Sequence, residues 1–469
     1  MGYTNGGFDQ LQNATPFLDA LAADGIKLAK YYSQQLCTPA RAALLSGYYP
    51  IHTGMQHDVI QPESVWGMPT DYMLLPSFLK KVGKYETFAI GKWHLGHYKS
   101  EYLPYNRGFD EFYGYLSDQL WYYSHKSPHA CAHSTCFYDM RHNGVHAVDS
   151  IGVYSTFLLS DQFDSIINRT SRTADPTFVY LSWQNVHAPL DPPPRKYFTA
   201  ADIALLDSVE DPYRRTFAAI TIILDNAMRA AVGTLQSYGL YDNVVLVVAS
   251  DNGGCSSSGG YNHPLRGGKQ YLYEGGIHVN AFVHSPLIPL ARRGGYYEGL
   301  FHVSDWVPTI VTGALNTRPE LLPADLDGID QWNALLRAND EEMRDYPRTE
   351  ILHNIDIWSL AHVGANLSLL STPIQAIRVG DMKLVMGQDA SSYFEPVFST
   401  CPEGLGYCSP SYENIEDCAY GYDNVTYLFN ITHDPSEAKN LASLRPDIVQ
   451  HLLERLQTFR DSMVDSVYA

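Results

Sequence analysis

Strand-like and helix-like segments alternate along this chain, and this alternation limits its fold more than any other feature. Apolar strands are predicted over 85–90, 178–183 and 244–249, and amphipathic helices over 76–82 and 213–238. Such an alternation is typical of an α/β protein with a mostly parallel sheet flanked by helices. With 469 residues, the chain can bury one large core and a second, smaller one.

Polar residues of unusual kinds follow each of these strands. They are Lys92 and His94 after the first strand, His187 after the second, and Asp251 with Asn252 after the third. The carboxyl ends of parallel strands meet at one edge of a sheet, so we expect these side chains to lie together. The sequence therefore predicts a ligand site at that edge.

The pattern changes near residue 350. A hairpin is predicted over 374–386 with its turn at Gly380-Asp381, and a terminal helix over 446–463. We therefore expect a large α/β domain over 1–350 and a smaller α+β domain with an antiparallel sheet over 351–469.

Charge and hydropathy exclude several classes of protein. Acidic residues outnumber basic ones 51 to 32, and the formal charge of −19 argues against a nucleic-acid partner. A few clustered cations can still dominate one pocket and bind an anionic substrate. No run of eighteen apolar residues occurs, so we expect no membrane span, and no signal peptide is visible in this chain.

Several features indicate a secretory protein. Asn-x-Ser/Thr triplets occur at Asn13, Asn168, Asn366, Asn424 and Asn430. Asn13 opens a helix and can equally serve as a neighbour of its cap. We predict glycosylation at the other four positions.

The cysteine count agrees with an oxidising compartment. If Cys37 is kept for chemistry, six remain, an even number that suits disulfides. Cys131 and Cys136 are close enough to close a small loop. A zinc site is the competing interpretation, but no Cys-x-x-Cys pair is present to favour it. The other four are Cys255, Cys401, Cys408 and Cys418.

Cys37 begins the most specific segment in the chain, Cys-Thr-Pro-Ala-Arg over 37–41. Pro39 suits the first turn of a helix, which is expected to continue to Ser46-Gly47. Cys37 would then sit at a helix N-terminus, where free N–H groups and the macrodipole favour an anion. Arg41, one turn on, would point back over the same end. An isolated segment of this kind is more often a plain buried Cys with a solvent-facing Arg.

This segment is not isolated, because further motifs follow it in order. The stretch 37–47 resembles the signature of the sulfatase family, and Gly-Lys-Trp-His-Leu-Gly over 91–96 resembles its second signature. Residues 49–57 and 107–110 are similar to the animal arylsulfatase B-like branch. The match extends over 185–190, 250–254, 265–269, 274–276, 428–431 and 434–435. The resemblance implies an alkaline-phosphatase-like fold and a sulfuric ester hydrolase.

The resemblance assigns catalytic roles to six residues. Cys37 would be oxidised to formylglycine by the formylglycine-generating enzyme, and its hydrated aldehyde would be the nucleophile. Arg41 and Lys92 would orient the hydrate, and Lys92 would also bind the sulfate. His94 would transfer a proton. His187 and Lys269 would bind the sulfate and protonate the leaving oxygen.

The resemblance also implies a metal, a substrate class and a location. Asp251 and Asn252, together with position 37, would hold one Ca²⁺ through hard donors. The expected substrates are sulfated sugars such as glycosaminoglycans, or aryl sulfates. The expected location is the secretory pathway, either the lysosome or the extracellular space.

One departure from the family bears on activity. Family members carry two consecutive Asp after an apolar first strand, and this chain begins just after that position, at Gly2-Tyr3. Either the chain is incomplete or the two metal ligands are truly lost, and the first explanation is favoured. A true loss would give a non-catalytic, sulfoglycan-binding pseudosulfatase. A phosphohydrolase or phosphonate hydrolase of the same superfamily is a second alternative.

The remaining histidines are given less weight. Structural roles are expected for His57 and His97. A second group lies around Cys131 and Cys136, where a metal site competes with a substrate-side loop closed by a disulfide, and we favour the loop. This group is His125, His129, His133, His142 and His146.

Overall fold

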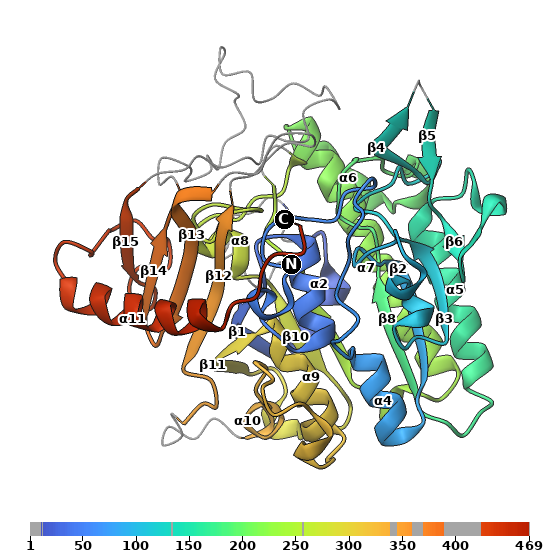
Figure 1. The fold of residues 1–469 in the computed structure, drawn as a ribbon. Helices are drawn as coiled ribbons and strands as arrows, with labels where there is room; N and C mark the ends of the chain where they lie inside the picture. Colours follow the sequence, from blue (N-terminus) through green and yellow to red (C-terminus); the bar gives the residue numbers. More distant parts are fainter. Residues whose placement is uncertain are drawn as a thin grey trace.

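The computed structural model describes residues 11–468, except for 12, 133–134, 256–257, 338–344, 359–368 and 389–423. Figure 1 shows the two parts of the molecule, with an antiparallel sheet and α11 on one side and the larger α/β part on the other. The expected α/β class with a separate antiparallel sheet is confirmed.

Two sheets form the framework of the α/β part. The first has the order β11-β1-β10-β9, and the second has the order β7-β6-β3-β2-β8. In the second sheet β2 runs parallel to both β3 and β8. In the first sheet β1 is parallel to β11 but antiparallel to β10. The strands of these two sheets are β1 (Ile26–Tyr32), β2 (Glu86–Lys92), β3 (Glu111–Tyr115), β6 (Arg141–His142), β7 (Val145–His146), β8 (Thr177–Ser182), β9 (Leu246–Ala249), β10 (Ala281–His284) and β11 (Tyr296–His302).

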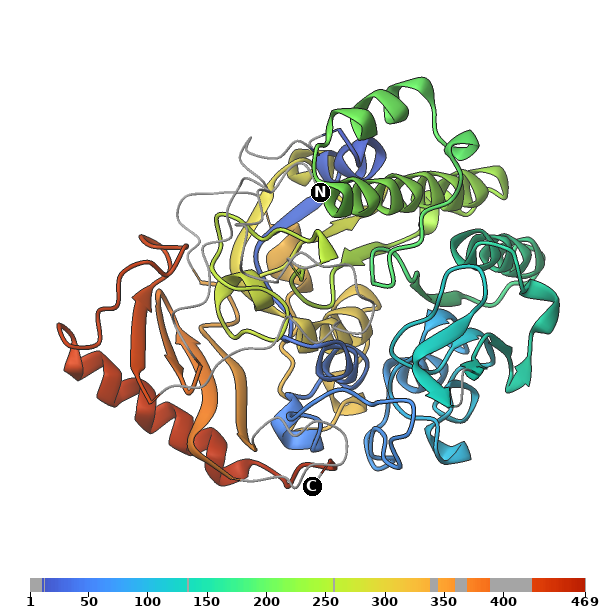
Figure 2. The ribbon, with the colours of Figure 1, turned by 90° about the horizontal axis from the view of Figure 1, so that it is seen from above.

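Helices cover both faces of β2 because its side chains alternate. Phe88 and Ile90 pack against α5 and α7. Ala89 packs on the opposite face against α2 and α4. α7 also lies along α1, as the view from above shows (Figure 2). The helices of this part are α1 (Pro16–Ala23), α2 (Cys37–Ser46), α3 (Pro50–Thr53), α4 (Leu75–Gly83), α5 (Ser155–Thr170), α6 (Ala200–Ser208), α7 (Pro212–Ser237), α8 (Glu274–Ile277), α9 (Trp306–Pro308) and α10 (Trp332–Leu336).

By length and hydropathy alone, α7 could cross a membrane, but 56% of its most apolar window is buried inside the protein. The core helix of a soluble protein passes the same test, so α7 is weak evidence for a span.

The C-terminal sheet has the order β12-β13-β14-β15 and is antiparallel throughout. Its predicted hairpin is confirmed, with the turn at Gly380-Asp381 between β13 and β14. The terminal helix α11 packs Leu452 and Leu456 against this sheet. The elements are β12 (Glu350–Trp358), β13 (Leu369–Val379), β14 (Met382–Met386), β15 (Thr426–Asn430) and α11 (Pro446–Ser462).

The cysteines fall partly outside the described residues. Cys131 and Cys136 face each other in the hairpin of β4 (Lys126–Ala132) and β5 (Thr135–Tyr138). Cys136 and Cys255 each belong to a disulfide bond, whereas Cys37 is free. The pairing of the six cysteines stays a prediction, and Cys401, Cys408 and Cys418 lie outside the described residues.

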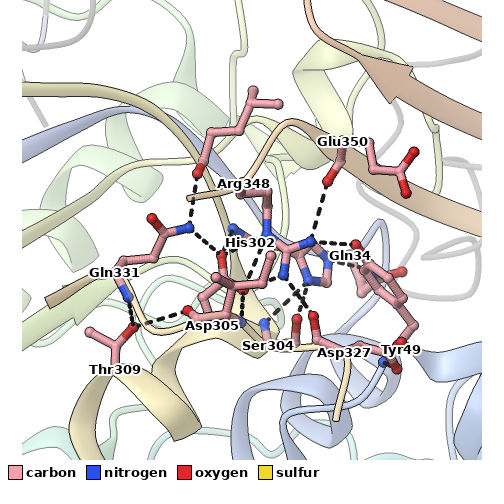
Figure 3. Close-up of polar contacts among 12 residues, drawn as sticks. Gln34, Tyr49, His302, Ser304, Asp305, Thr309, Asp327, Gln331, Arg348 and Glu350 are labelled. Atoms are coloured by element: carbon pink, nitrogen blue, oxygen red, sulfur yellow. Dashed lines mark hydrogen bonds and ion pairs between the residues drawn. The ribbon is translucent and has the colours of Figure 1, made fainter. Parts of the chain in front are cut away.

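A buried ion pair joins the end of β11 to the start of the C-terminal sheet. Arg348 binds Asp305 with side chains only 3% and 0% exposed. Arg348 also donates to the Tyr49 hydroxyl at 2.7 Å, and His302 connects the cluster to Gln34 at 3.1 Å (Figure 3). Gln34 lies three residues before Cys37, so this network fixes the approach to α2.

A second buried cluster joins β14 to α8. Lys383 Nζ lies 2.9 Å from Glu274 and 2.8 Å from Glu437, and all three side chains are fully buried. The Glu437 carboxylate also accepts from the Glu274 backbone N–H at 2.7 Å. Burial and the charge of Glu274 raise the pKa of Glu437 to about 7, against the opposing effect of Lys383.

Arg348→Ala is expected to lower the free energy of unfolding by about 3 to 5 kcal/mol, because it leaves the Asp305 carboxylate buried without its partner. Urea unfolding followed by circular dichroism measures this change. Lys80→Ala is the matched control, since the Lys80–Asp110 pair is 36% and 46% exposed and contributes under about 1 kcal/mol. Equal losses in the two variants would contradict the assigned role.

Glu437 also predicts a dependence of stability on pH. Its pKa in the folded protein, about 7, lies above the ordinary value of 4.5, so folding binds a proton. The contribution of this proton to the free energy of unfolding is fully present below pH 4.5 and is lost as the pH rises through 7. The unfolding midpoint should therefore rise from pH 7 to pH 5, and Glu437→Gln should flatten that rise. The exposed variant Glu454→Gln should keep it.

Candidate active site

Cys37 lies where the sequence predicts it, at the first residue of α2. Leu36 is extended before it, and the helix ends at Gly47 with φ +80°. The Cys37 side chain is buried, with 2% exposure, and its thiol contacts Asn252 Oδ1 at 3.3 Å. A helix N-terminus favours an anion, although Pro39 has no N–H and the Ala40 N–H donates to the Leu36 carbonyl at 3.1 Å.

Arg41, one turn along α2, joins the ends of three strands. Its guanidinium pairs with Asp251 at 2.8 Å, beyond β9. It donates to Ser182 Oγ at 2.6 Å and to the Tyr180 hydroxyl at 3.0 Å, both on β8. It also donates to the Lys92 carbonyl at 3.1 Å, at the end of β2. The predicted convergence at this edge of the sheets is therefore present.

Two lysines give this edge a strong positive charge. Lys92 is 3% exposed, and its ammonium has no hydrogen-bond partner among the described residues. Lys269 donates to His187 Nε2 at 2.9 Å. Burial alone would raise the pKa of the Cys37 thiol, but the charges of Lys269 and Lys92, with a smaller contribution from His187, outweigh it and hold the pKa well below its usual value. Position 37 is therefore held among groups that stabilise negative charge.

Contacts to carbonyl oxygens fix the proton positions on the two histidines. His187 Nδ1 lies 2.7 Å from the Ala188 carbonyl, so Nδ1 carries the proton and Nε2 accepts from Lys269. His94 Nε2 lies 2.9 Å from the Ile60 carbonyl, which leaves Nδ1 as its acceptor. Burial, together with nearby lysine charge, lowers the pKa of both rings. Both rings are therefore favoured in the neutral form.

The structure brings all eight predicted site residues to this edge. They are Cys37, Arg41, Lys92, His94, His187, Asp251, Asn252 and Lys269. The roles assigned to them stay proposals.

The predicted glycosylation sites lie away from this edge. Asn168 is on α5, Asn424 is exposed just before β15, and Asn430 ends β15. Asn13 is exposed before α1, and Asn366 lies outside the described residues. Glycosylation at these positions stays a prediction.

The described residues supply only part of a Ca²⁺ site. Within the part of the chain that the structure describes, no three His, Cys, Asp or Glu side chains gather as metal ligands. Asp251 and Asn252 offer oxygens beside Cys37, but one Asp251 oxygen is paired with Arg41. Calcium takes six to eight oxygen ligands. Two oxygen side chains do not meet that need.

Sequence reasoning missed three residues of the site. Tyr180 and Ser182 bind Arg41 from β8, and Asp118 lies just beyond β3, where its charge acts on Lys92 and His94. The rule of polar residues at strand ends, applied to β3, would have found Asp118.

The other histidines have separate partners. His57 pairs with Asp356 at 2.8 Å, and His97 binds the Pro62 carbonyl, so both have structural contacts. His129 pairs with Asp118 and His142 with Glu111. The described members of the second group therefore do not share one metal site.

Fold and site together define an α/β protein with a cluster of cationic side chains at the N-terminus of a helix. The sulfatase family model matches residues 3–314. The chain belongs to the sulfatase family, whose members are sulfuric ester hydrolases that generally use a formylglycine and a Ca²⁺ ion.

Relatives and solved structures agree with this assignment. The chain is 38% identical to arylsulfatase J from Mus musculus, over 100% of this chain and 75% of that protein. It is 28% identical to N-acetylgalactosamine-6-sulfatase from Sus scrofa, over 67% of this chain and 64% of that protein. The crystal structure of Ps i-CgsB in complex with k-i-k-neocarrahexaose has a TM-score of 0.74 at 23% identity, covering 97% of this chain and 88% of that one. PsFucS1 sulfatase from Pseudoalteromonas sp. has a TM-score of 0.72 at 22% identity, covering 96% and 86%.

Arg41→Lys is expected to lower the free energy of unfolding by about 3 kcal/mol, since one ammonium cannot reproduce a planar fork of donors to three strands. Thermal and urea unfolding measure the loss. Arg172→Lys is the control, because Arg172 is exposed and its guanidinium binds only the Asn168 side chain on the next turn back. A midpoint shift no larger than that of the control would contradict the bridging role.

Proposed function

We propose that this chain hydrolyses the sulfate esters of sugars, with formylglycine at position 37 as the nucleophile. One observation supports it most directly: the Lys92 ammonium is buried and without a partner in the described residues, beside the free Cys37 at the start of α2. A buried, unpaired cation is costly, and an anionic substrate would offset that cost.

Position 37 suits oxidation to formylglycine because it is a free cysteine in the family's signature segment, at a helix N-terminus. When present, the hydrated aldehyde supplies the attacking oxygen. Lys92 and Lys269 hold the sulfate oxygens, and the backbone N–H groups of α2 face the same charge. The formylglycine-generating enzyme is the proposed partner during maturation.

Two histidines are placed to move protons. His187 accepts from Lys269 at Nε2, so the pair can deliver a proton to the leaving sugar oxygen. His94 Nδ1 is buried and has no partner among the described residues, so it can take a proton from the group at position 37. No step is assigned to Ca²⁺, because Asp251 and Asn252 are too few to hold it.

Sulfated sugars are the proposed substrates because the relatives point to them. One is named N-acetylgalactosamine-6-sulfatase, and one structural neighbour was solved with a carrahexaose. Disulfide-bonded Cys136 and Cys255 support a place in the secretory pathway, lysosomal or extracellular.

One alternative is a sulfoglycan-binding protein without activity. Hydrolysis of 4-nitrocatechol sulfate, with added Ca²⁺ and after co-expression with the formylglycine-generating enzyme, separates the two. Binding of sulfated glycan without turnover, in a chain that carries the aldehyde, would favour the alternative. Faster hydrolysis of aryl phosphates than of aryl sulfates would favour a phosphohydrolase.

Cys37→Ala is expected to lower kcat/KM for 4-nitrocatechol sulfate on the order of a thousandfold or more, because it removes the nucleophile. Mass spectrometry of the tryptic peptide 31–41 should show the aldehyde in the parent protein and neither aldehyde nor thiol in the variant. An unchanged unfolding midpoint would show that the variant is folded. Full activity of the variant would overturn the mechanism.

A further inference from the structure

An ion pair that the mechanism does not use lies beside the cationic pocket. His129 Nδ1, on β4, binds Asp118 Oδ2 at 2.7 Å. The Asp118 side chain is 8% exposed, whereas that of His129 is 36% exposed. The pair therefore presents an imidazole to solvent and keeps the carboxylate behind it.

The segment that carries Asp118 is fixed against the active site on both sides. The His94 N–H donates to the Leu116 carbonyl at 3.2 Å. The Asp139 carboxylate accepts from the N–H groups of Leu116 and Ser117 at 3.0 and 2.8 Å. Further along, the Tyr122 hydroxyl donates to the His187 carbonyl at 3.1 Å. Asp118 thus lies in a segment that is hydrogen-bonded to His94 at one end and to His187 at the other.

Charges around the pair define its state. Burial would raise the pKa of Asp118, but His129, with help from His94 and Lys92, lowers it to about 2. Burial would lower the pKa of His129, but Asp118, with help from Glu63, raises it against the opposing charge of Lys269. The ring is therefore readily protonated while the carboxylate stays ionised.

We propose that His129 is a substrate-binding residue that recognises a hydroxyl of the sulfated sugar ring, and that Asp118 is its positioning residue. This inference rests on the proposed function. Since Nδ1 is taken by Asp118, Nε2 is the ring nitrogen available to a sugar hydroxyl, which would replace the Gln119 amide nitrogen there.

The contact between His129 Nε2 and the Gln119 amide supports a sugar hydroxyl as the ligand of His129. The Gln119 amide nitrogen lies 2.7 Å from His129 Nε2, and Gln119 Oε1 is buried with no partner in the described residues. The amide nitrogen is a donor, so Nε2 accepts from it in the neutral ring. A hydroxyl can donate to Nε2 in its place and can accept from Nε2 when the ring is protonated. A second anionic group could only accept. The Asp118–His129 pair is also neutral overall, and Glu63 adds negative charge nearby, so a second sulfate or a carboxylate is not favoured.

The test compares one sugar substrate with one aryl substrate. Purified protein carrying formylglycine is assayed with 4-nitrocatechol sulfate and with N-acetylgalactosamine 6-sulfate, N-acetylgalactosamine 4-sulfate and glucosamine 6-sulfate. For the best of these sugars, His129→Ala should lower kcat/KM by a factor at least about tenfold greater than for the aryl sulfate, as for a lost hydrogen bond to a charged group. His142→Ala is the matched control, because His142 also pairs with a carboxylate, Glu111, at 3.1 Å.

Asp118→Asn tests the positioning role through pH. Without the carboxylate, the pKa of His129 falls, so KM for the sugar should begin to rise at a lower pH than KM for the aryl sulfate. Changes shared by both substrates report the charge lost beside Lys92 and His94. An unchanged pH profile of KM would overturn the role of Asp118.

The remaining outcomes are distinct. Equal losses on sugar and aryl substrates in His129→Ala, or no loss on either, would overturn the inference alone. So would a parent protein that hydrolyses the aryl sulfate but none of the three sugars. A parent protein carrying the aldehyde that hydrolyses neither kind of substrate would instead overturn the proposed function.

Discussion

The guanidinium of Arg41 is the interaction on which the rest of the site depends. Its hydrogen bonds hold the start of α2 against the end of β2, the middle of β8 and the loop after β9. β8 and β9 are edge strands of different sheets, so this one side chain joins the two sheets at the nucleophile. A planar fork with fixed donor directions suits this task, because each acceptor lies on a different element.

Much of the fold could be predicted from hydrophobic periodicity and from the Gly and Pro residues that mark helix ends and turns. The helix at Cys37 begins and ends where Pro39 and Gly47 indicate, and the hairpin turns at Gly380-Asp381. Parallel-strand logic also placed Lys92 and His187 at one edge, whereas Asp251 reaches it from β9, which pairs antiparallel with β10 in the other sheet. These features follow from local sequence and from one general rule of sheet topology, so no long-range knowledge was needed.

The buried ionic clusters could not be predicted in this way. Arg348 and Asp305 are 43 residues apart in sequence, and Lys383 and Glu274 are 109 apart. No local pattern marks a charged residue that will be buried, since most Arg, Lys and Glu residues are solvated. Such pairs are determined by how the C-terminal sheet docks on the α/β part. Only tertiary structure shows that the approach to Cys37 and the loop before α8 are held from that sheet.

The buried lysine at this site costs stability in the folded protein, and that cost is repaid only on binding an anion. The Lys92 ammonium is buried without a hydrogen-bond partner among the described residues. Burial and the nearby positive charges of Arg41 and Lys269 lower its pKa, so the charged form of Lys92 is destabilised in the folded protein. Folding alone gains nothing from this arrangement. Its benefit comes only when an anion enters, because the donors are then already oriented and little further rearrangement is required. The same logic places His129 at the rim, where its charge is already balanced by Asp118. Under the proposed function, Lys92 and Lys269 would select for the sulfate charge, and His129 would select for the neutral ring that carries it.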